Sequence, residues 1–330
     1  MAVVFSLTVV GFVMVADGIN PIVAYASLLN GAFGGAYNFA ETLAKAAPLT
    51  LTGLAVAIAF KCKVWNIGAE GQLYVGAIAA TWAGLTLTLP EPVHILVVIF
   101  LSFLFGAAYG LIPGFLKAKF RVNEILLTLM MNYLAIYFVS YLVENPWRDP
   151  SGITYSPVLS VSAWLPVLVP RTRLHMGVLI AVLSAIALHL ILHRTTFGYK
   201  TRAVGESPEA ARYGGINVIM TATIVMAISG GLAGLAGMGE VSGIQHRLMG
   251  GISPWYGYLG VIVALLGKLE PIGVLFAGIF LGALLVGADA MQRAAGVPVT
   301  VVYILEGLIM LFLVGGERAL SRYMGLRRER

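Results

Sequence analysis

The chain has 330 residues, of which 59% are hydrophobic and only 11% are charged, and its mean hydropathy is +0.91. An ordinary soluble domain carries about 25% charged residues, so this composition excludes a soluble globular fold. The net charge of +6 does not predict nucleic-acid binding, because the basic residues are spread over many loops; a basic surface facing anionic lipid explains it.

The apolar runs predict an all-α fold, a polytopic bundle of about ten transmembrane helices in a cytoplasmic membrane. A helix needs about 20 apolar residues to cross about 30 Å of hydrocarbon, and these runs are continuous rather than alternating, which argues against strands. In chain order, the predicted spans are residues 2–16, 40–60, 70–89, 93–116, 124–143, 174–193, 218–239, 255–267, 271–290 and 299–315. The eighth is too short to cross alone, which favours a broken or re-entrant helix there.

The distribution of Lys and Arg predicts that both termini are cytoplasmic. With the amino terminus inside, the inner loops hold 15 of the 21 basic residues: Lys61, Lys63, Lys117, Lys119, Arg121, Arg194, Lys200, Arg202, Arg212, Lys268, Arg318, Arg322, Arg327, Arg328 and Arg330. The first run has no basic segment before it and is interpreted as a span, not as a signal peptide.

The outer side carries one substantial loop, at about 144–173, which continues to His175. Its five prolines forbid a continuous helix. It is either a plain connector or a cap that meets an external partner. We assign its Trp147 and Trp164 to the aromatic belts that mark membrane interfaces.

Cysteine and histidine point to no metal site. The single cysteine, Cys62, excludes an intrachain disulfide. His189 and His193 are four residues apart and share a helical face, which is the spacing of a two-histidine metal pair. No third ligand is evident in the sequence. We therefore prefer the interpretation that the two histidines bind no metal and simply lie side by side next to Arg194.

Small residues are spaced for close helix packing. Gly230 and Gly234 lie four apart in SGGLAGLAG, and Gly278 and Gly282 do so in GIFLG. This spacing lets helix backbones approach closely, and we predict no further role for it.

The polar residues that could line a solute pathway are few. The segment KVWNIGAEGQLYVGA places Asn66, Glu70 and Gln72 among glycines at the inner end of the third span. A carboxylate in lipid costs about 2.5–3.5 kcal/mol, so Glu70 is expected to face a cavity, a partner or an interface. It either gates the pathway or pairs with Lys61 or Lys63 at the membrane edge.

Two further residues join this set, Asn132 in the middle of a span and Trp255. Amide and carboxylate groups near aromatic rings such as Tyr133, Tyr137 and Tyr303 could bind a polar solute that contains a ring. An interfacial aromatic belt explains the same rings without a ligand. Glu240, Asp289, Gln292 and Glu306 also lie within spans or near their outer ends.

The longest polar break in the second half, at about 195–217, is predicted to be cytoplasmic. The chain has no G-x-x-x-x-G-K-[ST] phosphate loop and no H-E-x-x-H or G-x-S-x-G motif. It is therefore not expected to be an enzyme. If ATP drives it, another polypeptide must hydrolyse the ATP, and this water-facing loop is a candidate docking surface.

Three stretches carry a family resemblance: VWNIGAEGQLYVGA, LKAKFRVNEILLTLMMNYLA and RTTFGYKTRAVGESPEAARYGGINV. HRLMGGISPWYGYLGVIVALLGKLEPIGV and ADAMQRAAGVP add weaker support. The chain resembles the permease subunits of ATP-binding-cassette (ABC) importers of the branched-chain amino acid, simple sugar and nucleoside branch, and the nucleoside permeases most. The general importer signature ends in Ile-x-Leu-Pro, but this chain has IVMAISGG in the corresponding region.

The resemblance implies a single permease domain over 1–330, in a bacterial or archaeal cytoplasmic membrane, that holds no cofactor itself. ATP and Mg²⁺ would bind to separate ATPase subunits, and a second, homologous permease chain and a substrate-binding lipoprotein would complete the importer, with no nucleic acid. A coupling loop would hold a short helix that docks on the ATPase; it comprises Gly205, Glu206, Ser207, Pro208, Glu209, Ala210, Ala211, Arg212, Tyr213 and Gly214. Ser207 should cap this helix, and Gly214 should end it. The alternatives are a simple-sugar permease and an ion-coupled secondary carrier or polytopic enzyme.

Overall fold

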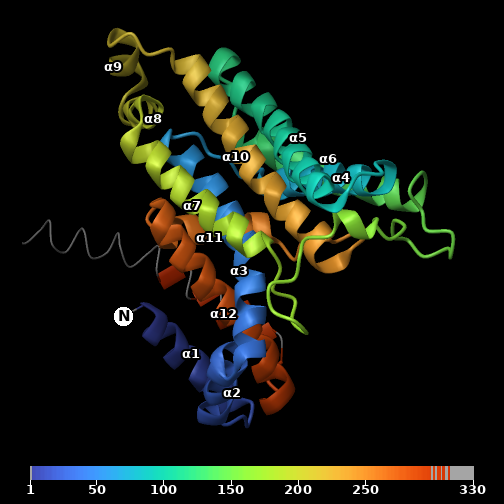
Figure 1. Ribbon diagram of the computed structural model, residues 1–330. Coiled ribbons are helices and arrows are strands. Elements are labelled where there is room, and N and C mark those ends of the chain that lie inside the picture. Colours follow the sequence, from blue (N-terminus) through green and yellow to red (C-terminus); the bar gives the residue numbers. More distant parts are fainter. Residues whose placement is uncertain (1, 299, 302, 306, 309–310, 313–330) are drawn as a thin grey trace, which may run out of the picture. The chain divides into compact units, whose positions relative to one another are not determined.

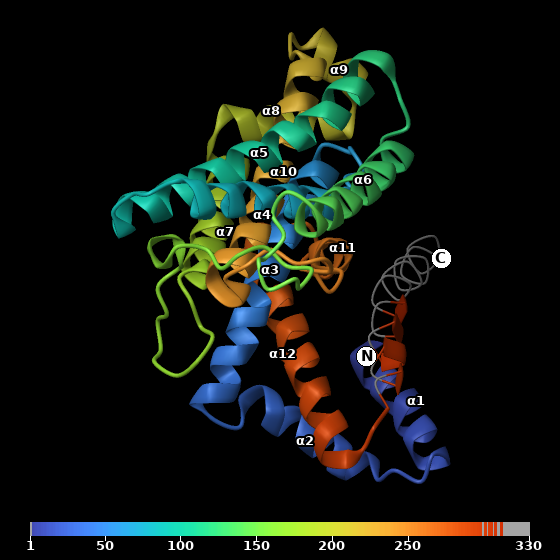
Figure 2. The same ribbon diagram turned by 90° about the vertical axis from the view of Figure 1, so that its right-hand side faces the viewer.

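The computed structural model describes residues 2–298, 300–301, 303–305, 307–308 and 311–312 (Figures 1 and 2). Its contacts divide these residues into two compact units. Unit 1 contains those up to Lys45 and those from Phe280 onward, and unit 2 contains Ala46–Ile279. Helices α3 and α12 contribute residues to both units.

The described part of the chain is helical, as predicted, and holds no named strand. Its α-helices are α1 (Ala2–Ala16), α2 (Pro21–Phe33), α3 (Ala36–Lys61), α4 (Ala69–Thr86), α5 (Glu91–Phe120), α6 (Glu124–Glu144), α7 (Gly177–Arg194), α8 (Thr196–Glu206), α9 (Pro208–Tyr213), α10 (Val218–Glu240), α11 (Tyr256–Leu266) and α12 (Pro271–Ala295). Two short turns are also present, η1 (Val161–Ala163, 3-10) and η2 (Val241–Gln245, π), and the described residues between 300 and 312 are helical as well.

Six described helices are long and apolar enough to cross a membrane: α3, α5, α6, α7, α10 extended through Gln245, and α12. α1, α2 and α11 are apolar but shorter. α4 is not among the six, although it was predicted as a span. The tenth predicted span, 299–315, lies partly outside the described residues, and Glu306 is one of the residues outside them.

Unit 1 contains a helix that the sequence did not predict. Asn20 caps α2, because its Oδ1 accepts hydrogen bonds from the backbone N–H groups of Ile22 (3.0 Å) and Val23 (3.5 Å), and Pro21 occupies the first turn. α2 has 13 residues, fewer than the about 20 that a helix needs to cross a membrane. It contributes Ala24 to an apolar core with Met14 of α1 and Met291 of α12.

In unit 2, α10 packs closely along α5 and α4 (Figures 1 and 2). A methyl group at Gly106 of α5 would overlap the carbonyl oxygen of Gly230 in α10, and one at Gly76 of α4 would overlap Gly234. The spacing in SGGLAGLAG therefore marks close packing, as predicted. Gly278 likewise lies against Thr50 of α3.

The predicted outer loop is folded onto the end of α10. The backbone N–H groups of Leu159 and Leu165 donate to the carbonyls of His246 (2.9 Å) and Ser242 (2.8 Å). Trp164 stacks on His246, with ring centroids 3.8 Å apart. The Trp164 ring takes part in this internal contact, and its assignment to a membrane belt stays a prediction. Trp147 lines an apolar cavity of about 220 Å³ with Trp82 and Phe138.

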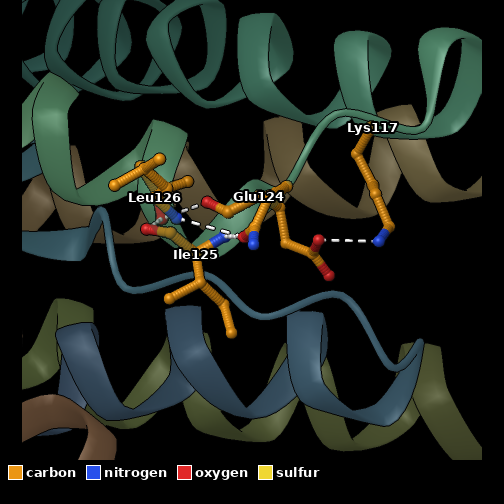
Figure 3. A network of polar contacts seen from close by, with 6 residues as sticks. Lys117, Glu124, Ile125 and Leu126 are labelled. Atoms are coloured by element: carbon orange, nitrogen blue, oxygen red, sulfur yellow. Dashed lines mark hydrogen bonds and ion pairs between the residues drawn. The ribbon is translucent and has the colours of Figure 1, made fainter.

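The turn between α5 and α6 is held by a cap and an ion pair (Figure 3). Asn123 Oδ1 accepts from the N–H groups of Ile125 (3.0 Å) and Leu126 (3.3 Å), which fixes the start of α6. Lys117 Nζ lies 2.6 Å from Glu124 Oε2, and Glu124 is buried. This turn and the ends of α3 and α7 lie at one end of unit 2. We call it the basic end.

Candidate functional site

The chain between α3 and α4 forms an irregular, buried break at residues 62–68. Asn66 Nδ2 donates to Gln72 Oε1 (2.8 Å) and to Ser229 Oγ of α10 (2.7 Å). Asn66 Oδ1 accepts from the N–H of Gly68 (2.9 Å) and from Gln72 Nε2 (3.2 Å). The side chains of Asn66 and Gln72 are buried, and their hydrogen bonds are made to other groups of the protein. The bond from Asn66 to Ser229 holds the break against α10.

Asn132 of α6 holds the same break from the other side. Its Oδ1 accepts from the N–H of Gly71 (2.8 Å), and its Nδ2 donates to the carbonyl of Ile67 (2.8 Å) and to Tyr258 Oη (3.0 Å). The mid-span amide therefore has the partners that its location demands. Asn66, Gln72 and Asn132 together position the first turn of α4, which carries Glu70.

Glu70 caps α11 rather than forming a salt bridge. Its Oε2 accepts from the N–H of Gly257, in the first turn of α11, at 2.7 Å, and the side chain is buried. A carboxylate at a helix N-terminus is stabilised by the unpaired N–H groups there. A methyl group at Gly257 would overlap the backbone of Glu70, so only glycine permits this approach.

Lys61 and Lys63, the sequence-based partners for Glu70, are engaged elsewhere. Lys61 Nζ pairs with Glu270 Oε1, and Glu270 Oε2 lies 2.8 Å from His193 Nε2. Lys63 Nζ donates to the carbonyl of Glu206 (3.4 Å). The hypothesis that Glu70 is an edge salt-bridge partner is therefore wrong in this structure.

The pKa of the Glu270 carboxyl reflects these contacts. Partial burial acts to raise it, but the hydrogen bonds and positive charges of Lys61 and His193 outweigh burial and hold the pKa below its usual value. The carboxylate is thus kept charged at the basic end.

Glu70 and the Lys268 turn lie at opposite ends of α11. This helix has 11 residues and is about 16 Å long, and it runs from Glu70 to the turn that carries Lys268 and Glu270.

Aromatic rings gather beside this buried network. Trp255, immediately before α11, is 60% exposed and lies 5.6 Å from the Tyr258 ring between centroids. On α6, Tyr133 and Tyr137 stack at 6.4 Å, and both are exposed. Tyr258 joins the two groups through its bond to Asn132, next to Tyr133. We call Tyr133, Tyr137, Trp255 and Tyr258 the aromatic face.

The polar break after α7 folds as two helices. Thr195 caps α8 through its Oγ1, which accepts from the N–H of Gly198 (3.2 Å). Ser207 caps α9, accepting from the N–H of Ala210 (3.2 Å), and Pro208 occupies the first turn. Gly214 ends α9, so the predicted short capped helix is confirmed in its bounds and in its cap.

Nearly every side chain of α9 is exposed. Ala211 alone among its six residues is buried, and Tyr213 is 95% exposed. Glu209 in the first turn and Arg212 in the last match the helix dipole. This helix presents a tyrosine and two opposite charges to the surroundings.

α8 connects α9 to the transmembrane helices. Gly205 packs so closely against the end of α3 that a methyl group would overlap the Lys61 carbonyl, and Lys63 bonds the carbonyl of Glu206. Arg202 donates to the carbonyl of Leu192 near the end of α7. α8 therefore contacts the ends of α3 and α7, the first of which leads directly to Asn66.

The sequence did not indicate several members of this site. Ser229, Ser253, Gly257, Tyr258 and Glu270 acquire their roles from contacts between distant segments. A serine or glycine in an apolar run carries no local signal of such a role. Glu270 is the exception. It is the single carboxylate between two apolar spans, so its charge alone could have marked it as a candidate site residue.

Comparisons with known proteins agree on one family. The family described as branched-chain amino acid transport system / permease component matches residues 38–314. The chain is 36% identical to a guanosine ABC transporter permease protein of Bacillus subtilis, covering 98% of this chain and 94% of that protein.

Two further relatives match over similar lengths. A glucose ABC transporter permease protein of Haloferax volcanii is 34% identical over 96% of this chain and 86% of its own. A nucleoside ABC transporter permease protein of Lactococcus lactis is 32% identical over 95% and 89%. The chain belongs to the family of ABC transport permeases described as branched-chain amino acid transport system / permease component.

Proposed function

We propose that this chain is the transmembrane subunit of an ABC importer that carries nucleosides across a bacterial or archaeal cytoplasmic membrane. The observation that carries the proposal is the exposed, capped helix α9 at the basic end of unit 2. A helix with five of its six side chains exposed, among them Tyr213, fits a surface that another protein covers.

The energy for uphill transport comes from ATP hydrolysis in separate subunits, which bind ATP and Mg²⁺ and hold α9 in a groove. The basic end faces the cytoplasm, since it collects the Lys and Arg of the inner loops. A second permease chain of the same family forms the other half of the channel. A substrate-binding lipoprotein delivers solute at the opposite end, where the loop folded onto η2 lies.

The coupling route follows contacts of named residues. Movement of α9 is transmitted through α8 to the end of α3, where Gly205 contacts Lys61 and Lys63 contacts Glu206. The chain then enters the break that Asn66 anchors, and the next helix begins with Glu70. Because Glu70 caps α11, a shift in the break changes the position of α11 and of Trp255 beside it.

The aromatic face supports a solute that contains a ring. Stacking on aromatic side chains is worth about 1–3 kcal/mol per base and tolerates different bases. The length of α11, about 16 Å, separates Trp255 from the basic end, so we place Trp255 and Tyr258 about halfway across about 30 Å of hydrocarbon, whereas interfacial belts lie at its two edges. We therefore assign the rings to the pathway, with the Asn66, Gln72 and Asn132 network as the scaffold behind them.

The docking role of α9 is tested by replacing Glu209 and Arg212 together with Ala. The ATPase subunit should no longer co-purify, and uptake should fall at least about tenfold, because both charges and the dipole-matched ends of α9 are lost. Insertion should stay normal. A matched control is Lys200→Ala on α8, which should retain the ATPase. Unchanged co-purification and uptake in the double variant would contradict the docking role.

The solute is tested by uptake into vesicles that contain the reconstituted complex, in competition with nucleosides, nucleobases and simple sugars. Nucleosides should compete best, and Trp255→Ala should weaken nucleoside competition while leaving ATPase association intact. Competition by glucose alone would assign the chain to the sugar branch, which the Haloferax relative favours. Uptake driven by an ion gradient without an ATPase would overturn the proposal.

A further inference from the structure

Three potential metal ligands meet at the basic end of unit 2, away from the aromatic face. His189 and His193 come from the last turns of α7, and Glu270 comes from the turn before α12. One ligand atom of each lies within 4.8 Å of those of the other two. The sequence indicated the two histidines by their spacing, but it gave no sign of Glu270, which is 77 residues from His193.

One ring nitrogen of this cluster has no hydrogen-bond partner. Glu270 uses Oε1 for Lys61, and its Oε2 faces His193 Nε2 at 2.8 Å. His189 Nδ1 is buried without a hydrogen-bond partner. A buried ring nitrogen without a partner costs free energy, and coordination of a cation is one way to recover it.

We propose that His189, His193 and Glu270 form a binding site for a divalent transition metal such as Zn²⁺, with a water molecule as the fourth ligand. Two histidines and one glutamate are a ligand set that zinc accepts, at bond lengths of about 2.0–2.2 Å. In a tetrahedron with such bonds, the ligand atoms lie about 3.3 Å apart. Rotation of the three side chains brings atoms that are now within 4.8 Å to this spacing.

Lys61 has two opposing effects on this site. Its bond to Oε1 orients the carboxylate and presents Oε2 to the histidines, which is how outer groups position metal ligands. Its positive charge also repels a divalent cation and sets the site at moderate affinity.

A bound metal would join the end of α7 to the turn between α11 and α12. α8 begins two residues after Arg194, so the joined elements lie directly beside the helices that carry α9. The metal site is independent of which solute the protein carries and of whether α9 docks on an ATPase.

The test uses the full chain in lipid nanodiscs, purified with a tag that contains no histidine. Binding of Co²⁺ is followed by the absorption bands of a tetrahedral Co²⁺ site, and Zn²⁺ is added in competition. The expected result is one ion per chain. His189→Gln and His193→Gln should each weaken binding at least about tenfold, since each removes one of three protein ligands.

Two controls locate the site. His246→Gln and Cys62→Ser remove other metal-binding side chains and should leave the affinity within about twofold. Equal affinity in wild type and both α7 histidine variants, or equal loss in His246→Gln, would overturn the proposal.

A measurement on the unaltered chain tests the site even if the variants fail to fold. Histidine modification by diethyl pyrocarbonate is quantified by mass spectrometry with and without Zn²⁺. Zinc should protect His193 and His189 and leave His246 equally reactive. Absence of protection at His193, which is exposed in the metal-free structure, would exclude the site.

Discussion

Single polar residues in this chain mostly bind backbone groups of irregular segments. Asn132 uses its amide for the backbone of Gly71 and Ile67 and for Tyr258, and Glu70 accepts from the N–H of Gly257. A buried polar group that lost its partner would cost about 1–3 kcal/mol. The few polar residues within the spans therefore determine where helices break.

The Lys117–Glu124 pair allows this cost to be measured. Lys117→Met should lower the free energy of unfolding by about 1–3 kcal/mol, because it leaves the buried Glu124 carboxylate without its cation. The double variant Lys117→Met/Glu124→Gln should recover much of this loss. Reversible unfolding in mixed micelles measures both. A double variant as unstable as the single one would contradict this account.

At the scale of elements, sequence periodicity and length located most helices well. The predicted spans 124–143 and 218–239 differ by one residue from α6 (Glu124–Glu144) and α10 (Val218–Glu240), because Asn123 and Asn217 cap them and mark their starts. α2 was missed although its 13 residues are as many as those of the predicted span 255–267, because Ser27 and Asn30 interrupt its apolar sequence.

Other features could not be predicted, for a physical reason. The π turn Val241–Gln245 and the contacts of Glu70 with α11 depend on segments that are far apart in the sequence. The sequence predicted which polar residues lie at the site, but it did not predict which groups they bind. Glu70 was predicted to face a partner, and it does bind the N–H of Gly257. The predicted alternative partners, Lys61 and Lys63, are close to Glu70 in the sequence but bind Glu270 and the carbonyl of Glu206 instead.

Close packing of α10 on α5 gives a test with a control on the same helix. Gly234→Ala should destabilise the protein by about 1–3 kcal/mol, because the added methyl group would overlap the carbonyl oxygen of Ser102. At Gly239 the methyl group would meet only His175 Cε1 at 3.8 Å, an ordinary contact. Gly239→Ala should therefore be neutral or slightly stabilising. Unfolding titrations compare the two, and equal effects would contradict the packing argument.

At the scale of the whole molecule, buried histidine makes stability depend on pH. His175 precedes α7, and burial, with a smaller effect of His246, lowers its pKa from 6.5 to about 4. The unfolded chain thus binds a proton below about pH 6.5 that the folded chain excludes until about pH 4. The stabilising effect of neutral His175 is full above pH 6.5 and is lost as pH falls through this window.

We expect the free energy of unfolding to fall by up to about 1.4 kcal/mol per pH unit through this residue between pH 6.5 and 4. His175→Gln should show a shallower slope in that window and a parallel curve above pH 7. Unfolding at a series of pH values in the same micelles provides the comparison. Identical slopes in the two proteins would show that His175 does not titrate as its burial implies.

The low apolar content of α4 has a consequence for how the protein is made. α4 ends at Thr86, whereas α10, against which it packs, ends at Glu240, so 240 − 86 = 154 further residues must be synthesised before this partner is complete. At about 5–20 residues per second, this takes roughly 8–30 s. Through that interval Glu70 and Gln72 have neither α10 nor α11 beside them. We therefore expect α4 to reach its final position only after these later helices have emerged.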